Sequence, residues 1–350
     1  MATIVLTGGG TAGHCVPHLA ILPYLKNDFD KIYYIGSTNG LEKNIVENAN
    51  IEFFSVPCVK LNRSLSFDNL TIPFKLAYSI KKAGKILDKL KPDVVFSKGG
   101  YVSIPTVIAS YKRKIPVISH ESDYSMGLAN RISARYVRRI LTSFPDTEKL
   151  NAKCKYVGIP IRRELFNVDK TKALESFNLD GKKPILLITG GSQGALTINN
   201  VVRSSLPQLL STFDIIHICG KGNIDDKIQY KGYVQLEFIH KIQNAFAVAS
   251  VCVTRAGANT LFELLSLKIP SLLIPLPKGS SRGDQIENAN YFQKLGVVSV
   301  LPQDALTEKS LVFSVYSTYA NRDVIKTNLA LNPINDCSRL VSRIIADYID

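Results

Sequence analysis

Residues 251–263 combine a glycine turn with a helix start, an arrangement that binds phosphate groups. The β-branched run Val251–Val253 is followed by Arg255-Ala256-Gly257-Ala258 and then by apolar residues at helical spacing. This order predicts a strand, a tight turn and a helix. A helix that opens at Asn259 or Thr260 directs unpaired backbone N–H groups and its positive dipole end beyond the strand, where a diphosphate is stabilised. The motif therefore predicts a nucleotide site.

A purely structural interpretation fits the same residues. Thr260-x-x-Glu263 matches a capping box, in which the carboxylate of Glu263 returns to the amide of the N-cap residue. The motif alone leaves open whether Glu263 binds a ligand or caps its own helix.

The N-terminus carries a second glycine turn. A strand at Thr3–Thr7 is followed by Gly8, Gly10 and Gly13 in G-x-G-x-x-G spacing and by a helix from Pro17, which is the context of a dinucleotide fold. The next strand, predicted at residues 31–35, ends in Gly-Ser-Thr and has no acid to hold an adenosine ribose. This argues against NAD, but a phosphate or sugar can still approach the glycine backbone closely.

A third turn repeats this pattern in the second half of the chain. Gly190-Gly191-Ser192-Gln193-Gly194 lies between a strand at Pro184–Thr189 and a helix at Ala195–Leu210, about half a chain length after the first turn. The repeat and the length of 350 residues predict two similar β/α domains, 1–160 and 161–334, with a cleft between them. A last amphipathic helix, about 335–350, could cross back onto the first domain.

One further polar cluster follows a strand of the first domain. The strand predicted at Pro116–Ser119 ends in His120-Glu121-Ser122-Asp123. Open α/β sheets place their ligand crevice at the carboxyl ends of strands. We therefore expect this cluster to line a binding site.

The composition is that of an ordinary globular protein, with 45% hydrophobic and 21% charged residues. The six cysteines form no C-x-x-C pair and no His lies at metal spacing, so neither a disulfide framework nor a zinc site is expected. A reducing, cytoplasmic compartment fits this cysteine usage. There is no basic n-region and no apolar run of 18 residues, so neither a signal peptide nor a membrane span is predicted.

The positive charge is concentrated in the first half. Residues 1–160 carry 22 Lys and Arg against 12 Asp and Glu, whereas residues 161–350 carry 21 against 17. Such a field suits an anionic partner, either nucleic acid or an acidic membrane, although a plain solubility surface is the alternative. Within this half, Leu61–Lys91 joins an apolar stretch to a basic amphipathic helix. It is either a surface that lies on anionic lipid or a core helix with a solvated lysine face.

Taken together, six motifs in family order resemble the MurG family, the UDP-N-acetylglucosamine transferases that convert lipid I to lipid II in peptidoglycan synthesis. The similarity covers nearly the whole chain. The motifs are Gly9-Gly10-Thr11-Ala12-Gly13-His14 with Pro17, Lys98-Gly99-Gly100-Tyr101-Val102-Ser103, Gly158-Ile159-Pro160-Ile161-Arg162, Gly190-Gly191-Ser192-Gln193-Gly194-Ala195, Arg255-Ala256-Gly257-Ala258, and Asp284-Gln285 with Asn288-Ala289.

The resemblance implies a GT-B fold of two Rossmann-like α/β domains facing across a cleft, an inverting reaction, no metal ion and no cofactor. By position, the family's donor-site residues fall on Thr11, Ala12, Gly13, Arg162, Ser192, Glu263 and Gln285. In the family, the Glu at the position of Glu263 holds the uridine ribose. Ser192 resembles the residue that donates a hydrogen bond to the diphosphate. Arg162 supplies charge there, or is simply a surface ion pair.

His14 resembles the family's acid/base candidate. Inversion requires the acceptor 4-hydroxyl to lose its proton during attack, and a neutral imidazole has a pKa near the operating pH. The alternative is a helix-terminal His that only orients phosphate. Many family members have His-Glu-Gln-Asn where this chain has His120-Glu121-Ser122-Asp123, so Asp123 is either a substitute base or lies outside the site.

The implied partners are UDP-N-acetylglucosamine, lipid I and the anionic cytoplasmic face of the cell membrane, where the protein would be peripheral. Within the same fold the alternatives are a diacylglycerol glycosyltransferase and a UDP-N-acetylglucosamine epimerase, and the basic apolar segment disfavours the epimerase. A nucleic-acid-binding protein would explain the net charge of +14. No RNP, helix-turn-helix or aromatic-interleaved basic motif supports it, so no nucleic-acid partner is expected.

Overall fold

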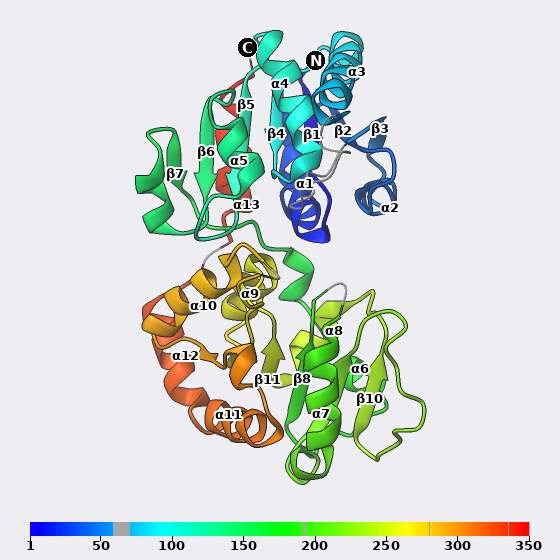
Figure 1. Cartoon of the computed structure of the whole chain (residues 1–350), viewed down its shortest axis with the longest axis vertical. Coiled ribbons are helices and arrows are strands. Elements are labelled where there is room, and N and C mark those ends of the chain that lie inside the picture. The colour runs from blue at the N-terminus through cyan, green and yellow to red at the C-terminus, as the bar shows by residue number, and fades with distance from the viewer. Residues whose placement is uncertain (59–70, 192–193, 280, 335, 350) are drawn as a thin grey trace. The chain divides into compact units, whose positions relative to one another are not determined.

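The computed structural model describes residues 1–58, 71–191, 194–279, 281–334 and 336–349 (Figure 1). Its internal contacts divide the chain into two compact units. Unit 1 comprises Met1–Arg162 and Asp336–Asp350, and unit 2 comprises Arg163–Asn335. Each unit is built around its own parallel β-sheet.

The sheet of unit 1 has seven parallel strands in the order β3-β2-β1-β4-β5-β6-β7. The strands are β1 (Thr3–Thr7), β2 (Lys31–Ser37), β3 (Glu52–Val56), β4 (Val94–Ser97), β5 (Val117–Glu121), β6 (Arg139–Thr142) and β7 (Cys154–Tyr156). The order reverses between β1 and β4, which pair directly with Ile4 opposite Val94. In a doubly wound sheet this reversal point is where ligands bind.

Helices cover both faces of this sheet, because alternate residues of each buried strand point to opposite sides. They are α1 (Val16–Asp28), α2 (Glu42–Glu47), α3 (Ile72–Leu90), α4 (Ile104–Lys112), α5 (Leu128–Ser133) and α13 (Ser338–Ala346). On one face Ile4 and Leu6 of β1 share a core with Ile21 of α1 and Val341 of α13. On the other face Val5 packs in a core that includes Ala83 and Leu87 of α3 and Val107 of α4.

The C-terminal segment is therefore part of unit 1. The backbone of Ile159 pairs with that of Asp336, where the chain leaves unit 1 and where it returns. The carboxylate of Asp336 accepts hydrogen bonds from the amides of Ile161 at 3.0 Å and Ser338 at 2.8 Å. Helix α13 then packs against α1, and the hydroxyl of Ser342 donates to Asp28 at 3.5 Å.

Unit 2 has six parallel strands in the order β10-β9-β8-β11-β12-β13. They are β8 (Ile185–Thr189), β9 (Asp214–Ile218), β10 (Tyr233–Leu236), β11 (Ala249–Thr254), β12 (Ser271–Leu273) and β13 (Ser299–Val300). Its helices are α6 (Lys170–Glu175), α7 (Leu196–Leu209), α8 (Ile242–Val248), α9 (Ala258–Ser266), α10 (Asp284–Lys294), α11 (Glu308–Ala320) and α12 (Arg322–Leu331). Leu186 and Ile188 of β8 pack in one core with Val202 of α7 and Leu311 of α11.

Both units are open parallel sheets with helices in most of the connections between strands, so the predicted α/β class with two Rossmann-like domains is confirmed. The detailed boundaries differ in places. Strand β5 continues through His120 and Glu121 instead of ending at Ser119, and α11 and α12 were not assigned from the sequence. Of the segment Leu61–Lys91, the basic helix is α3, while residues 59–70 lie outside the described residues. Within the described part of the chain, no helix is both long and apolar enough to traverse a bilayer.

Candidate functional site

In unit 1, two glycine turns meet at the point where the strand order reverses. One follows β1 and the other follows β4, and these strands are neighbours. A Cβ atom on Gly100 would lie 2.2 Å from the carbonyl oxygen of Gly9, and Gly100 has φ 76°. Only glycine fits such a close approach in the left-handed region. The two turns thus form one closely packed glycine surface at the carboxyl ends of the strands.

His14 lies at the edge of this surface. It ends the short 3-10 helix Ala12–His14, and its Nδ1 lies 2.8 Å from the hydroxyl oxygen of Thr11. A Cβ atom on Gly100 would lie 3.3 Å from the imidazole Cγ, so the His14 ring packs beside the second turn. Thr11, Ala12, Gly13 and His14 therefore all lie in the segment between β1 and α1.

The buried carboxylate of Glu42 holds the first turn through hydrogen bonds to backbone amides. Glu42 is only 1% exposed, and its Oε1 accepts the amide of Ser37 at 2.8 Å. Its Oε2 accepts the amide of Gly10 at 3.4 Å. Added Cβ atoms on Gly9 or Gly40 would collide with this carboxylate. Sequence reasoning missed Glu42, because 32 residues separate it from Gly10 and no local pattern marks it.

The second turn contains a buried cation. Lys98 directly follows β4 and is 2% exposed. Its ammonium donates to Nδ1 of His120 at 2.6 Å and to the hydroxyl of Ser122 at 2.8 Å. The Nε2 of His120 lies 2.9 Å from the carbonyl oxygen of Gly158. Since that carbonyl can only accept, Nε2 carries the proton and Nδ1 is the acceptor for Lys98.

Burial governs the protonation of this pair. It lowers the pKa of Lys98 to about 8, although the negative charge of Glu121 acts in the opposite direction. The pKa of His120 is lowered by burial and by the nearby Lys98 charge, so His120 is neutral. Lys98 was part of a quoted motif but not of the predicted site, and its position directly after a buried strand was the available signal.

The predicted polar cluster, residues 120–123, lies at the carboxyl end of β5. Within it, Glu121 and Asp123 have different surroundings. Glu121 is buried and accepts the amides of Asp123 at 3.0 Å and Gly127 at 2.8 Å, and the Asn130 side chain at 2.9 Å. Burial, followed by the charge of Asp123, raises the pKa of Glu121. Glu121 therefore shapes the loop, whereas Asp123 is half-buried on it.

His18, the other histidine near the first turn, belongs to the core. It is 1% exposed, and its ring makes edge contacts with those of Tyr34 and Phe96 at centroid distances of 5.3 and 5.6 Å. Burial, Lys98 and His14 all lower the pKa of His18. An enclosed imidazole cannot contact a substrate, so His18 is not a candidate base, and His14 stays the candidate of the first turn.

In unit 2, the two predicted phosphate-type turns also follow neighbouring strands at the reversal of strand order. Strands β8 and β11 pair in parallel, with Thr189 opposite Thr254, and α7 and α9 begin shortly after them at Leu196 and Ala258. Gly194 has φ 75° and packs against the carbonyl of Cys219, where an added Cβ would be 2.1 Å away. Two helix starts thus follow neighbouring strands at the carboxyl ends of this sheet, where helix N-termini can stabilise a diphosphate.

The capping interpretation of Glu263 is wrong. Helix α9 begins at Ala258 after the N-cap residue Gly257, not at Asn259 or Thr260. Thr260 is therefore inside the first turn and cannot form a capping box with Glu263. Glu263 lies one and a half turns into the helix, 8% exposed, so its carboxylate is not needed to satisfy the helix start.

Three polar side chains join the neighbouring segments of this edge. Arg255 is buried and donates to the carbonyl of Ile274 at 3.0 Å, and desolvation lowers its pKa. The side-chain oxygen of Gln285 accepts the amide of Leu276 at 3.1 Å. Asn288 donates to the carbonyl of Ala256 at 3.1 Å. These bonds hold the start of α10 against the turn after β11.

The predicted donor-site residues lie on different elements. Glu263 is in α9 and Gln285 in α10 of unit 2, and Arg162 is the last residue of unit 1 before the crossing. Ser192 lies outside the described residues. Across the described part of the chain, no group of three or more His, Cys, Asp or Glu side chains is placed to hold a metal ion.

Comparison with known proteins gives matches in both units. The glycosyltransferase family 28 N-terminal domain matches residues 4–142, and the family 28 C-terminal domain matches residues 185–340. The chain is 44% identical over 351 residues to the UDP-N-acetylglucosamine–N-acetylmuramyl-(pentapeptide) pyrophosphoryl-undecaprenol N-acetylglucosamine transferase of Lachnospira eligens, covering 99% of each chain. It is 48% identical over 312 residues to the protein of that name from Oceanobacillus iheyensis, covering 88% of this chain and 87% of the relative.

Solved structures show the same fold. Acinetobacter baumannii MurG superposes with a TM-score of 0.74 at 24% identity, covering 100% of this chain and 99% of that one. The calicheamicin glycosyltransferase CalG4 superposes with a TM-score of 0.67 at 14% identity, covering 99% and 97%. The predicted GT-B glycosyltransferase fold is therefore confirmed.

Proposed function

Because the chain belongs to the family of UDP-N-acetylglucosamine–N-acetylmuramyl-(pentapeptide) pyrophosphoryl-undecaprenol N-acetylglucosamine transferases, we propose that it transfers N-acetylglucosamine from UDP-N-acetylglucosamine to lipid I, giving lipid II for peptidoglycan synthesis. The reaction inverts the anomeric centre, with the 4-hydroxyl of the acceptor as the nucleophile. The diacylglycerol glycosyltransferase, the epimerase and the nucleic-acid-binding protein are not favoured by these relatives.

The observation that carries this proposal is the paired helix starts of α7 and α9 beside β8 and β11. The positive dipole ends of these two helices stabilise the donor diphosphate, and Arg162 and Ser192 add positive charge and a hydroxyl donor. Glu263 accepts from the vicinal hydroxyls of the ribose, and Gln285 orients the sugar. The capping role that competed for Glu263 is removed by the start of α9 at Ala258, which supports this assignment.

For the acceptor, unit 1 offers the glycine surface and His14. The Thr11 hydroxyl oxygen, 2.8 Å from Nδ1, orients the imidazole of His14 beside the two turns. As general base, His14 removes the proton of the acceptor hydroxyl while that oxygen attacks the anomeric carbon. The backbone at Thr11, Ala12 and Gly13 then lies close to the reacting groups. Asp123 is not required for this step.

We further propose that unit 1 meets the anionic cytoplasmic face of the cell membrane, where the polyprenyl tail of the acceptor stays. Helix α3 supports this, because Phe74 is 80% and Tyr78 61% exposed. Both follow helical i, i+4 spacing, and Lys81 and Lys85 continue the same exposed side. The opposite side of α3, with Ala83 and Leu87, packs in the core.

The test is transfer of radiolabelled N-acetylglucosamine from UDP-N-acetylglucosamine to a lipid I analogue, with and without a chelator. Labelled product should form equally in both reactions. Each reaction is repeated with a diacylglycerol acceptor to separate the related activities. No transfer to the lipid I analogue, or transfer only to diacylglycerol, would overturn the proposal.

A further inference from the structure

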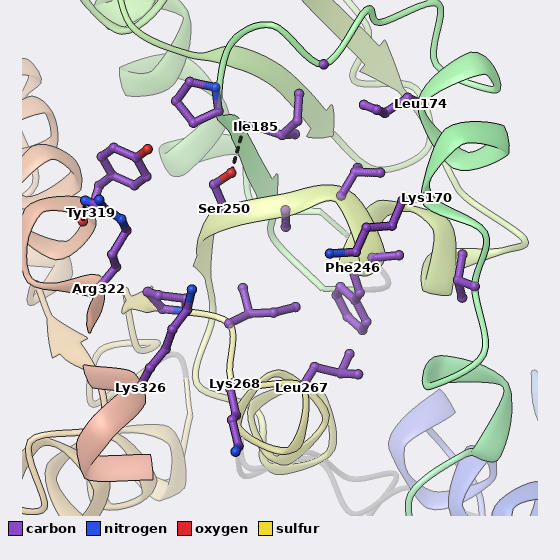
Figure 2. Close-up of a pocket in the computed structure, with 18 of the residues that line it drawn as sticks. Lys170, Leu174, Ile185, Phe246, Ser250, Leu267, Lys268, Tyr319, Arg322 and Lys326 are labelled. Atoms are coloured by element: carbon purple, nitrogen blue, oxygen red, sulfur yellow. Dashed lines mark hydrogen bonds between the residues drawn. The ribbon is translucent and has the colours of Figure 1, made fainter. Parts of the chain in front are cut away.

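Unit 2 contains a cavity of about 620 Å³ that the transfer reaction does not use (Figure 2). It lies at the amino ends of the strands, where Pro184 precedes β8 and Pro270 precedes β12. The phosphate-type turns follow the carboxyl ends of the same sheet, at Thr189 and Thr254. The cavity is therefore on the opposite edge from the donor site, and its volume is in the range of small-molecule pockets.

The lining combines apolar and cationic residues. Phe246, Leu174 and Leu267 contribute apolar surface, and the described lining residues include no Asp or Glu. The basic residues of the lining are Lys170, Lys182, Lys183, Lys268, Arg322 and Lys326. Figure 2 shows the side chains of Lys170 and Lys326 reaching toward the middle of the cavity from opposite walls.

Local contacts leave part of this charge uncompensated. Lys182 pairs with Asp180 at 3.3 Å, and Lys183 donates to the carbonyl of Leu210 at 2.7 Å. No hydrogen bond or ion pair joins Lys170 or Lys326 to another side chain within the described residues. Clustered cations repel one another, so an anion that enters the cavity is stabilised by them.

Helix α12 contributes two of these cations, although two like charges on neighbouring turns destabilise the helix. Arg322 and Lys326 are four residues apart, the spacing at which like charges destabilise a helix. The guanidinium of Arg322 lies over the ring of Tyr319, 4.6 Å from its centroid, and Asp323 is a distant partner at 3.8 Å. This stacking holds the guanidinium on the cavity wall.

A β-bulge places a hydroxyl in the same cavity. The pairing of β11 with β8 slips between Ala249 and Val251, and the extra residue is Ser250. Its Oγ accepts the amide of Ile185 at 3.2 Å (Figure 2). That bond uses a lone pair and leaves the hydroxyl proton available to donate. Bulges are enriched beside binding sites, because they redirect a side chain in this way.

We propose that this cavity binds a phosphomonoester with an apolar chain or ring. Lys170, Lys326, Arg322 and Ser250 hold the phosphate, and the apolar part packs on Phe166 and Leu267. A phosphomonoester carries nearly two negative charges and three acceptor oxygens, which matches several cations and a hydroxyl donor. The apolar lining favours an organic ester over inorganic phosphate. The site is separate from the proposed donor site.

The probe is octyl phosphate, added to the full chain below its micelle concentration and followed by calorimetry. We expect one saturable site, at least tenfold tighter than for inorganic phosphate or octyl glucoside. Lys170→Gln and Lys326→Gln should each weaken binding about tenfold, as expected for the loss of a charged hydrogen bond. Lys309→Gln, an exposed lysine of α11 outside the cavity, is the matched control and should change nothing.

Two further measurements test the contact with the apolar part of the ligand and the location of its site. Phe166 lines the cavity and is 49% exposed, so Phe166→Ser should weaken octyl phosphate but not inorganic phosphate. Excess UDP-N-acetylglucosamine should leave octyl phosphate binding unchanged. Displacement by UDP-N-acetylglucosamine, or undiminished binding in the Lys170→Gln, Lys326→Gln double variant, would overturn the proposal.

A phosphomonoester joined to an apolar group occurs both in free metabolites and in the headgroup of phosphatidic acid. Phosphatidic acid vesicles distinguish them, with the double variant as the comparison. Weaker cosedimentation of the double variant than of the unaltered chain assigns the site to the headgroup. Equal cosedimentation, with octyl phosphate binding lost, assigns it to the free phosphomonoester.

Discussion

Lys98 holds its ammonium in a buried position, and this makes the stability of unit 1 depend on pH. Its pKa is about 8 in the folded chain against the ordinary 10.5. Between these two values the unfolded chain binds more protons than the folded one, so stability rises with pH. The penalty of burying the charge is fully present below pH 8 and is relieved as the pH approaches 10.5.

We therefore predict that Lys98→Met removes the part of the pH dependence of the unfolding free energy that comes from this buried ammonium. The free energy of unfolding of the unaltered chain, minus that of the variant, should increase by about 3 kcal/mol between pH 7 and pH 10.5, at 1.36 kcal/mol per pKa unit. Urea unfolding of both proteins at several pH values measures it. Parallel curves for the two proteins would show that Lys98 is not perturbed.

The helix start at Ala258 removes the capping box of Glu263, and the ribose role is then the prediction to test. If it holds the ribose, Glu263→Ala should weaken UDP binding by about 1.5–3 kcal/mol, the size of a charged hydrogen bond. Thr260→Ala is the matched control, because Thr260 lies inside α9 and caps nothing. Calorimetry gives the affinity and thermal unfolding gives the stability. A loss of stability that explains the whole loss of affinity would assign Glu263 to the fold.

His14 is expected to act on turnover rather than on donor affinity. His14→Ala should lower kcat by about 10² to 10⁴, the range for loss of a general base, with UDP affinity little changed. Steady-state kinetics and direct UDP binding separate the two quantities. Unchanged turnover rejects the base role, and a selective loss of UDP affinity indicates that His14 orients phosphate.

Helix α3 shows how one element can combine a structural side and a binding side. Its buried residues Ala83 and Leu87 fix it on the sheet, so Phe74 and Tyr78 remain exposed. Basic residues near an anionic surface each contribute about 1 kcal/mol. Apolar contact and charge together are needed for reversible membrane binding.

We predict salt-sensitive cosedimentation with anionic vesicles and little with neutral ones. Replacing Lys81, Lys82 and Lys85 together by Gln should weaken it, because about 3 kcal/mol of attraction is lost. Lys26→Gln, Lys43→Gln, Lys112→Gln, on other helices of unit 1, is the matched triple control. If binding ignores both lipid charge and the α3 change while transfer to a soluble acceptor persists, α3 is an ordinary solvated helix.

At the scale of the whole molecule, a contact within unit 1 joins the segment where the chain leaves this unit to the segment where it returns. Asp336 accepts from the amides of Ile161 and Ser338, so it ties the returning segment to the departing one. Asp336→Ala should lower the stability of unit 1 by about 1.5–3 kcal/mol, since buried amides lose a charged acceptor. Thermal unfolding measures this effect.

Asp336→Asn keeps an oxygen acceptor and is the matched control. It should retain most of the stability that Asp336→Ala loses. Equal stability of Asp336→Ala and the unaltered chain would show that the packing of α13 on α1 is sufficient by itself.

Local patterns in the sequence were enough to predict the α/β class and the repeated strand-turn-helix units. The reason is that a buried strand needs an apolar run, and a turn in the left-handed region needs glycine, so both leave a signal within a few residues. The motifs around Gly100 and Gly194 were therefore recognisable before their contacts were known.

The tertiary structure decided what lies between distant segments. It placed Glu42 behind Gly10, joined Lys98 to His120, and linked Ile161 to Asp336 across 175 residues. It also started α9 at Ala258, which removed the capping box. Such contacts depend on which strands become neighbours and on what each buried polar group must satisfy, and neither is encoded in a local period.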